Sequence, residues 1–217
     1  MKSAILFDID GTLVDSNEYH IQAWDEVFRE AGHVISREDL HRHIGKGGDT
    51  YVPSLLPGVE PEKQEEMADR HGRLYKARYI DQVKPFRGAR DLLLRTRDSA
   101  RKVVLASSAS QEELEHYLEL LDAHEIVDAT TSKDDVAHSK PCPDIFRTAV
   151  NKAGVAPEAA LVVGDTPFDM EAAGRAGIAS VAVRSGKFRD EDLKGSLAIY
   201  DDVAALLSGF EASPLAN

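Results

Sequence analysis

The chain of 217 residues contains very little cysteine and no long apolar run. Its single cysteine, Cys142, excludes an internal disulfide and suits a reducing compartment. No stretch approaches the length of a membrane-spanning helix, and the N-terminus runs from one lysine into a short apolar segment that lacks the length of a signal peptide. We therefore expect a cytoplasmic protein without a membrane partner.

Basic residues are also scarce, since 26 Lys and Arg stand against 38 Asp and Glu. The resulting net charge of -12 argues against a nucleic-acid partner, because polyanions would be repelled. Any anionic substrate would have to be held by local cations or by a metal ion. Length and an apolar content of 42% suit one domain, or one domain with a modest insertion. Monomer and homodimer both remain open.

Short apolar runs alternate with longer helical patterns over most of the chain. Capping residues mark some helices: Ser110 with Glu113 forms a capping-box pattern, and an apolar helical stripe ends at Gly154. This alternation is typical of an α/β fold, and we expect a Rossmann-like, doubly wound, mostly parallel sheet. The strands are predicted at 4–7, 102–106, 160–163 and 178–183, with weaker candidates at 126–130 and 197–199.

One long segment interrupts this alternation. Residues 16–85 contain no convincing strand and several amphipathic helical patterns. Such a block, placed directly after the first strand, predicts an inserted all-helical domain. The α/β core would then consist of residues 1–15 and 86–217.

Acidic side chains follow two of the predicted strands. Asp8 and Asp10 come after the first strand, whereas Asp165 and Asp169 follow the strand at 160–163. Because ligands bind at the carboxyl ends of parallel strands, we expect these carboxylates to converge at one edge of the sheet. A buried cluster of this kind needs a hard divalent cation, and oxygen ligands indicate Mg²⁺.

Each of these residues also has a purely structural interpretation. A single Asp after a strand is most often a turn residue or a helix cap. Asp169 in particular, with Thr166 and Pro167, fits the beginning of a helix. Ser107 and Lys140 taken alone are an ordinary loop serine and an ordinary lysine. The combination, and no single member, favours a catalytic site.

Four ordered segments resemble the motifs of the haloacid dehalogenase-like superfamily: DIDGTLVDS, the serine in VVLASSAS, SKPCPD and VVGDTPFD. The first segment is similar to the phosphatase form, because an acid stands at Asp10 where dehalogenases of the superfamily have none. The resemblance implies a magnesium-dependent phosphatase that works through an aspartyl phosphate and carries a helical cap. It implies Asp8 as nucleophile and Asp10 as general acid and base, with the proton affinity of Asp10 above that of Asp8.

The remaining roles follow from the same resemblance. Ser107 with adjacent backbone N–H groups, including that of Ser108, would hold the phosphoryl oxygens, and Lys140 would offset their charge. Magnesium would be bound by Asp8, the backbone carbonyl of Asp10, Asp165 and Asp169, the last directly or through water.

Within the cap, the segments EYHIQAW and IGKGGD bear on the substrate. EYHIQAW resembles the cap start of the β-phosphoglucomutase and sugar-phosphatase branch; His20 suits either core or site, and Trp24 suits core packing. IGKGGD offers Lys46 between glycines, either for a substrate or as a plain surface loop. His41 and His43 are expected to be surface histidines.

The IGKGGD segment replaces the specificity loop associated with the mutase. This favours a phosphatase of a small phosphorylated metabolite, similar to phosphoglycolate or sugar-phosphate phosphatases. A β-phosphoglucomutase-like mutase is the first alternative. A phospho-acceptor regulatory domain, which shares the sheet, the Asp cluster and Mg²⁺, is the second.

Overall fold

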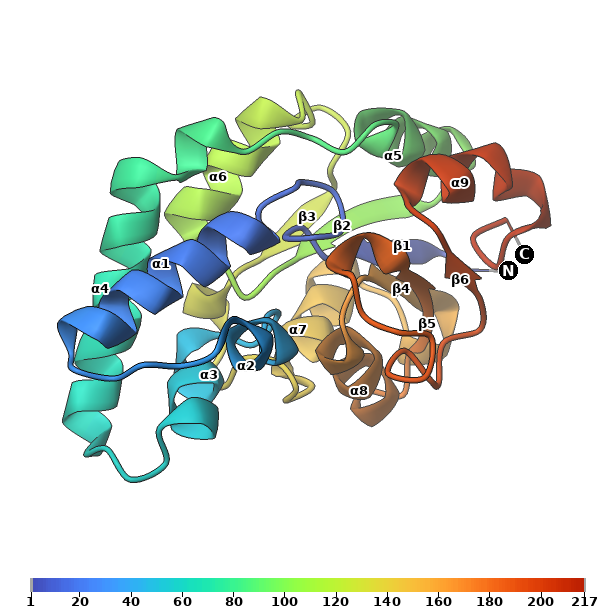
Figure 1. Ribbon diagram of the computed structural model, residues 1–217. Helices are drawn as coiled ribbons and strands as arrows, with labels where there is room; N and C mark the ends of the chain where they lie inside the picture. The colour runs from blue at the N-terminus through green and yellow to red at the C-terminus, as the bar shows by residue number, and fades with distance from the viewer. Residues whose placement is uncertain (1, 217) are drawn as a thin grey trace.

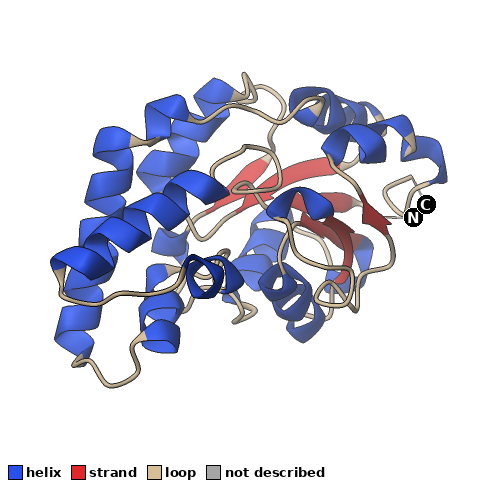
Figure 2. Ribbon diagram, viewed as in Figure 1, coloured by secondary structure: helices blue, strands red, loops and turns tan. Residues whose placement is uncertain are grey.

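A parallel six-stranded sheet forms the centre of the computed structural model, which describes residues 2–216 (Figures 1 and 2). The spatial order is β3-β2-β1-β4-β5-β6, and every neighbouring pair is parallel. The order reverses at β1, which makes this a doubly wound sheet and confirms the predicted fold class. The strands are β1 (Ala4–Phe7), β2 (Lys102–Ala106), β3 (Ala129–Thr131), β4 (Ala160–Gly164), β5 (Ala179–Val183) and β6 (Ile199–Tyr200).

The two weaker strand predictions were displaced along the chain. The segment predicted at 126–130 begins as a turn, in which the backbone N–H of Ile126 donates to Ala123, and β3 starts only at Ala129. Ile126 is buried, so its apolar character serves the packing of that turn. The last strand, predicted at 197–199, is formed by Ile199–Tyr200.

Helices cover both faces of the sheet, as expected for buried parallel strands. Successive residues of β1 therefore point into different apolar clusters: Ile5 packs on the side of α5 and α9, and Leu6 on the side of α7 and α8. The helices of the α/β part are α5 (Ala89–Asp98), α6 (Gln111–Leu120), α7 (Asp144–Ala153), α8 (Pro167–Arg175) and α9 (Val203–Ser208). Short 3₁₀ turns are η1 (Ile80–Gln82), η2 (Lys133–Asp135), η3 (Pro157–Ala159), η4 (Arg184–Gly186) and η5 (Phe210–Ala212).

Local capping explains where several helices begin and end. The capping box predicted at Ser110 and Glu113 is present, and Gly154 adopts the left-handed conformation that ends α7. Thr166 caps α8, where Asp169 returns the hydrogen bond as the third helical residue. Within residues 2–216, no helix combines the length and the apolar character that crossing a membrane requires.

Between β1 and α5 the chain forms a helical block, seen on the left of Figure 1. Its helices are α1 (Asn17–Glu30), α2 (Arg37–Arg42), α3 (Gly48–Leu55) and α4 (Pro61–Arg78). The two segments that connect it to the sheet run side by side, because Asp15 N–H donates to the Lys84 carbonyl and Phe86 N–H to the Leu13 carbonyl, both at 2.9 Å.

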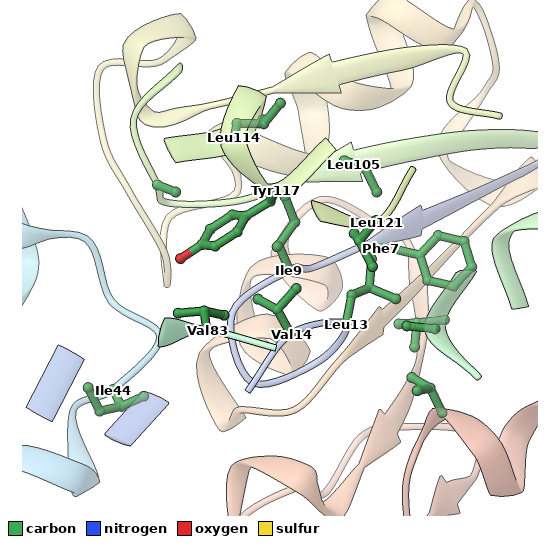
Figure 3. Close-up of a cluster of buried hydrophobic side chains, with 14 of the residues drawn as sticks. Phe7, Ile9, Leu13, Val14, Ile44, Val83, Leu105, Leu114, Tyr117 and Leu121 are labelled. Carbon is green, nitrogen blue, oxygen red and sulfur yellow. The ribbon is translucent and has the colours of Figure 1, made fainter. Parts of the chain in front are cut away.

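One apolar cluster continues from the sheet into the helical block. Figure 3 shows Phe7 and Leu105 of the sheet, the loop residues Ile9 and Leu13, and the Tyr117 ring of α6 in this cluster. The same cluster includes Ile44 and Val83 of the block, so the two parts share one apolar core.

Candidate active site

The loops after β1 and β4 bring three carboxylates together. Oxygen atoms of Asp8, Asp165 and Asp169 lie within 4.8 Å of one another, and all three residues are buried. Gly11 makes this approach possible: its φ of 76° turns the chain sharply, and a Cβ at this position would overlap the Asp165 carboxylate. The glycine that directly follows the Asp8 and Asp10 pair is thus required by both turn and packing.

A buried lysine lies against this carboxylate cluster. The Lys140 ammonium donates to Asp8 Oδ1 at 2.6 Å and to Asp169 Oδ1 at 2.7 Å, and the residue is only 1% exposed. Burial by itself would lower the pKa of Lys140, but the charges of Asp169 and Asp8 outweigh it and hold that pKa well above its ordinary value. Lys140 is therefore a fixed cation aimed at Asp8.

Asp169 both caps a helix and belongs to the carboxylate cluster. Its Oδ2 accepts from the Thr166 N–H at 3.0 Å and from the Thr166 hydroxyl at 2.6 Å, which caps α8. Its Oδ1 accepts from Lys140. The capping interaction thus holds the carboxylate in the cluster, and the two interpretations do not compete.

The cluster holds more negative charge than Lys140 alone can neutralise. Burial, together with the charges of Asp169 and Asp10, raises the pKa of Asp8 to about 7 even though Lys140 lowers it. Burial, followed by the charges of Asp8 and Asp169, raises the pKa of Asp165 well above its ordinary value. Three buried carboxylates with oxygen ligands only are a donor set that fits Mg²⁺, so the residues present match the predicted metal.

Asp10 is turned away from the carboxylate cluster. Its Oδ1 lies 2.6 Å from Ser16 Oγ, 2.9 Å from Tyr117 Oη and 3.1 Å from His20 Nε2, and its Oδ2 lies 3.2 Å from Ser107 Oγ. These contacts occupy the Asp10 side chain, and a metal contact through its backbone carbonyl stays a prediction.

In the protein without a metal ion, the pKa of Asp8 lies above that of Asp10. Burial raises the pKa of Asp10, but the hydrogen bond and charge of His20, with donors from Ser16 and Tyr117, lower it to about 2. The pKa of Asp8 lies near 7 without a metal ion. The predicted order, in which Asp10 binds its proton more tightly than Asp8, refers to a site with Mg²⁺ beside Asp8 and stays a prediction. Converging donors stabilise the carboxylate of Asp10, whereas Asp8 has carboxylate neighbours.

His20 faces the site through its contact with Asp10 and also belongs to an aromatic stack. Its ring lies 3.8 Å from that of Tyr75 and 5.3 Å from that of His71, between ring centroids. His71 stacks in turn on Trp24 at 3.9 Å. Trp24 is 4% exposed, which confirms core packing, and it also lines the cavity described next.

A cavity of about 510 Å³ lies between the helical block and the sheet. Ser107 borders it, and its hydroxyl accepts from the Ala109 N–H at 3.0 Å. Ser108 lies beside it with a buried hydroxyl oxygen that has no hydrogen-bond partner within residues 2–216. The predicted site residues that line the cavity are Asp8, Asp10, His20, Lys46, Ser107, Ser108 and Lys140.

Lys46 lines the cavity, but its ammonium already has partners. The Nζ atom lies 2.7 Å from Ser54 Oγ and 3.0 Å from His43 Nδ1, and it sits 4.7 Å from the centre of the Phe168 ring. Phe168 belongs to α8, so Lys46 contributes to the contact between the helical block and the sheet domain.

The two histidines expected at the surface also lie at this contact, and that expectation is corrected. His41 and His43 are half-buried. His41 Nε2 lies 2.8 Å from the Gly186 carbonyl, and its ring stacks on Phe188 at 4.8 Å. The two histidines have separate partners, since His41 contacts the segment after β5 and His43 contacts Lys46.

The glycine-rich segment lines the cavity and also packs closely against the loop around Ser139. A Cβ on Gly47 would overlap the side chain of Ser139. Just beyond it, Asp49 Oδ2 accepts from the Ser139 N–H at 2.9 Å, and the Thr50 hydroxyl donates to the Lys140 carbonyl at 2.8 Å. The segment is thus bound to the loop that presents Lys140.

Tyr117 and His71 are site residues that the sequence analysis missed. Tyr117 occupies the apolar stripe of α6, three residues after Leu114, and this position indicated core packing only. The one weak signal in the sequence was a tyrosine on the apolar face of the helix, because a buried phenol hydroxyl needs a hydrogen-bond partner.

Comparison with known proteins gives consistent matches. A family model described as haloacid dehalogenase-like hydrolase matches residues 5–183. The phosphorylated carbohydrates phosphatase of Thermotoga maritima is 30% identical over 177 residues, which are 81% of this chain and 82% of the relative. The beta-phosphoglucomutase of Bacillus subtilis is 30% identical over 195 residues, 85% of this chain and 84% of the relative. A crystal structure of a hydrolase from Pseudomonas syringae is 29% identical with a TM-score of 0.90, covering 97% of this chain and 99% of that one.

Proposed function

Since the chain belongs to the haloacid dehalogenase-like hydrolase family, we propose that it is a phosphatase that hydrolyses a small phosphorylated metabolite, either a phosphorylated acid such as phosphoglycolate or a sugar phosphate. One observation above all supports this proposal. Asp8 borders the cavity with its Oδ1 2.6 Å from the buried Lys140 ammonium and with two more carboxylates beside it. A nucleophile, a cation and a carboxylate set that could hold a metal are combined in the way that attack on a phosphate dianion requires.

Asp8 is the proposed nucleophile. Its carboxylate oxygen attacks phosphorus, the bond from phosphorus to the leaving oxygen breaks, and an aspartyl phosphate forms. Lys140 reduces the repulsion between the carboxylate and the phosphoryl group, and Ser107 and the buried Ser108 hydroxyl offer hydrogen bonds to phosphoryl oxygens. Mg²⁺, when held by Asp8, the Asp10 carbonyl, Asp165 and Asp169, supplies further charge neutralisation.

Asp10 is the proposed general acid and base. It protonates the leaving alcohol and then accepts a proton from the water that hydrolyses the aspartyl phosphate. A phosphoryl dianion next to Asp10 raises the pKa of its carboxyl group, because a nearby like charge disfavours ionisation. This shift opposes the low pKa that His20 and Ser16 impose on the protein alone.

The helical block, residues 16–85, is the proposed cap of this site, with residues 1–15 and 86–217 as the core. The cap excludes water and contacts the leaving group, with His20 and Lys46 as the proposed contacts. The lone Cys142 supports a reducing, cytoplasmic environment.

A mutase is the second candidate, and the 30% identity to a beta-phosphoglucomutase is the observation that favours it. A mutase must bind its sugar in two orientations through several directional contacts. Here the glycine-rich segment offers one cation, Lys46, whose ammonium also contacts Ser54 and His43; this suits one contact with the substrate better than several directional contacts in two orientations. Hydrolysis therefore remains the better supported reaction.

The test is a screen of phosphorylated metabolites with Mg²⁺, read out as free phosphate over many turnovers. We expect multiple turnovers on at least one phosphorylated acid or sugar. A single phosphorylation from acetyl phosphate without turnover would instead support the phospho-acceptor alternative. Formation of glucose 6-phosphate from β-glucose 1-phosphate and a bisphosphate primer, faster than phosphate release, would favour the mutase.

A further inference from the structure

A buried chain of hydroxyl groups connects the helical block to Asp10. Tyr75 lies on α4 of the block and Tyr117 on α6 of the sheet domain, and both side chains are fully buried. Their phenolic oxygens are 2.6 Å apart, and Tyr117 Oη lies 2.9 Å from Asp10 Oδ1. The contacts join residues that are 42 and 107 positions apart in the chain.

The direction of these hydrogen bonds follows from the chemistry of the groups. An ionised carboxylate only accepts, so Tyr117 donates its proton to Asp10 Oδ1. The oxygen of Tyr117 then accepts from Tyr75, which is the remaining donor of the pair. Both buried hydroxyls are satisfied in this arrangement, as their removal from water requires.

This chain distinguishes the two oxygens of Asp10. Oδ1 lies within hydrogen-bond distance of Ser16, His20 and Tyr117, whereas Oδ2 has, among residues 2–216, only the Ser107 hydroxyl, at 3.2 Å. An oxygen with three partners has no lone pair left to exchange a proton with a substrate. The oxygen that carries the catalytic proton is therefore Oδ2.

We infer that Tyr117, supported by Tyr75, is a positioning residue that holds Asp10 Oδ1 so that Oδ2 is presented to the leaving oxygen of the substrate. This inference rests on the proposed role of Asp10 as general acid. Because Tyr75 belongs to the helical block, it can hold Tyr117 in place only when that block is packed against the sheet domain. The His20 ring, stacked on Tyr75 at 3.8 Å, keeps the phenol in place.

The test compares two substrates whose leaving groups differ in their need for a proton. When an alkyl phosphate such as a sugar phosphate reacts, its alcohol leaves as a strongly basic alkoxide unless the leaving oxygen is protonated. When p-nitrophenyl phosphate reacts, p-nitrophenolate is a weak base and leaves without a proton. Tyr117→Phe keeps the ring and removes only the hydroxyl. We expect kcat/KM to fall about tenfold or more for the alkyl phosphate, a part of the full contribution of general acid catalysis, and less than about threefold for p-nitrophenyl phosphate.

Tyr75→Phe is also expected to lower kcat/KM more for the alkyl phosphate than for p-nitrophenyl phosphate, but by a smaller factor. In the double variant, the fold-loss in kcat/KM should be smaller than the product of the two single fold-losses. The matched control is Tyr51→Phe, which also removes a buried tyrosine hydroxyl, here one that donates to the Leu40 carbonyl at 2.8 Å. This control should leave both kcat/KM values unchanged.

Equal losses on both substrates, or no loss on the alkyl phosphate, would overturn the inference. If Tyr117→Phe does not fold, Tyr75→Phe must show the selectivity alone, and its absence there overturns the inference as well. Failure of the wild-type protein to turn over either substrate would overturn the proposed function itself, and the two failures are thus distinguishable.

Discussion

Replacement of Lys140 by methionine should damage both the activity and the stability of the protein. Methionine retains most of the volume of the side chain stem and removes the ammonium that bonds Asp8 at 2.6 Å and Asp169 at 2.7 Å. Loss of one preorganised charge of this kind lowers turnover by on the order of 100-fold. The variant tests whether the lysine acts on the substrate or is only an internal counterion.

The stability effect can be worked out from burial. Lys140 is 1% exposed, and removing one partner of a buried ion pair costs about 3–5 kcal/mol, because the carboxylates are left uncompensated. At about 2–4 °C per kcal/mol for a chain of this size, the melting temperature should fall by roughly 6–20 °C.

The loss of stability caused by Lys140→Met should grow as the pH rises. Burial already raises the pKa of Asp8 to about 7, and losing Lys140 raises it further. The folded state therefore binds more protons than the unfolded state, so ionisation destabilises it as pH rises above the ordinary value of 3.8. The variant should be closest to wild type near pH 5 and furthest from it near pH 8, and added Mg²⁺ should reduce the difference.

Chemical denaturation in EDTA at the two pH values, with steady-state kinetics in Mg²⁺, measures these effects. Lys152→Met is the matched control: this lysine is 37% exposed and pairs with Asp135 at 2.8 Å, so its loss should cost less than about 1 kcal/mol and leave turnover unchanged. A turnover loss below about threefold for Lys140→Met, or a stability loss no larger than that of the control, would refute the reasoning.

Three other changes test separate parts of the site. Asp8→Asn should abolish turnover with an unchanged circular dichroism spectrum, and a residual rate of a tenth of wild type would exclude Asp8 as nucleophile. EDTA should stop phosphate release and Ca²⁺ should restore it poorly, since Ca²⁺ accepts looser geometry; full activity in excess EDTA would contradict the metal assignment. Lys46→Ala should raise KM more than it lowers kcat, because its ammonium holds a wall of the cavity against Phe168; unchanged constants would make Lys46 a plain surface contact.

Local sequence signals predicted the framework of the protein well. The apolar runs that became β1, β2, β4 and β5 are too short for helices and lie between capped helical segments, so their position needed no tertiary information. The same holds for the Thr166 cap of α8, whose hydrogen bonds span only three residues. Because the strands are parallel, the residues that follow them had to meet at one edge of the sheet, which made Asp8 and Asp165 predictable as neighbours.

Tertiary packing decided what the side chains at that edge do. Tyr117 reaches Asp10 across 107 residues of sequence, and the apolar stripe of α6 that carries it would look the same in a helix with no catalytic contact. Lys46 stood in a segment typical of ligand loops, yet its ammonium lies over Phe168 of a different element.

The relative proton affinities of Asp8 and Asp10 were likewise beyond the sequence. Periodicity states which residues are buried, but the pKa of a buried carboxyl depends on which charges and donors lie within a few ångströms of it. Those neighbours are set by how the helical block packs on the sheet, and this packing carries no local sequence signature.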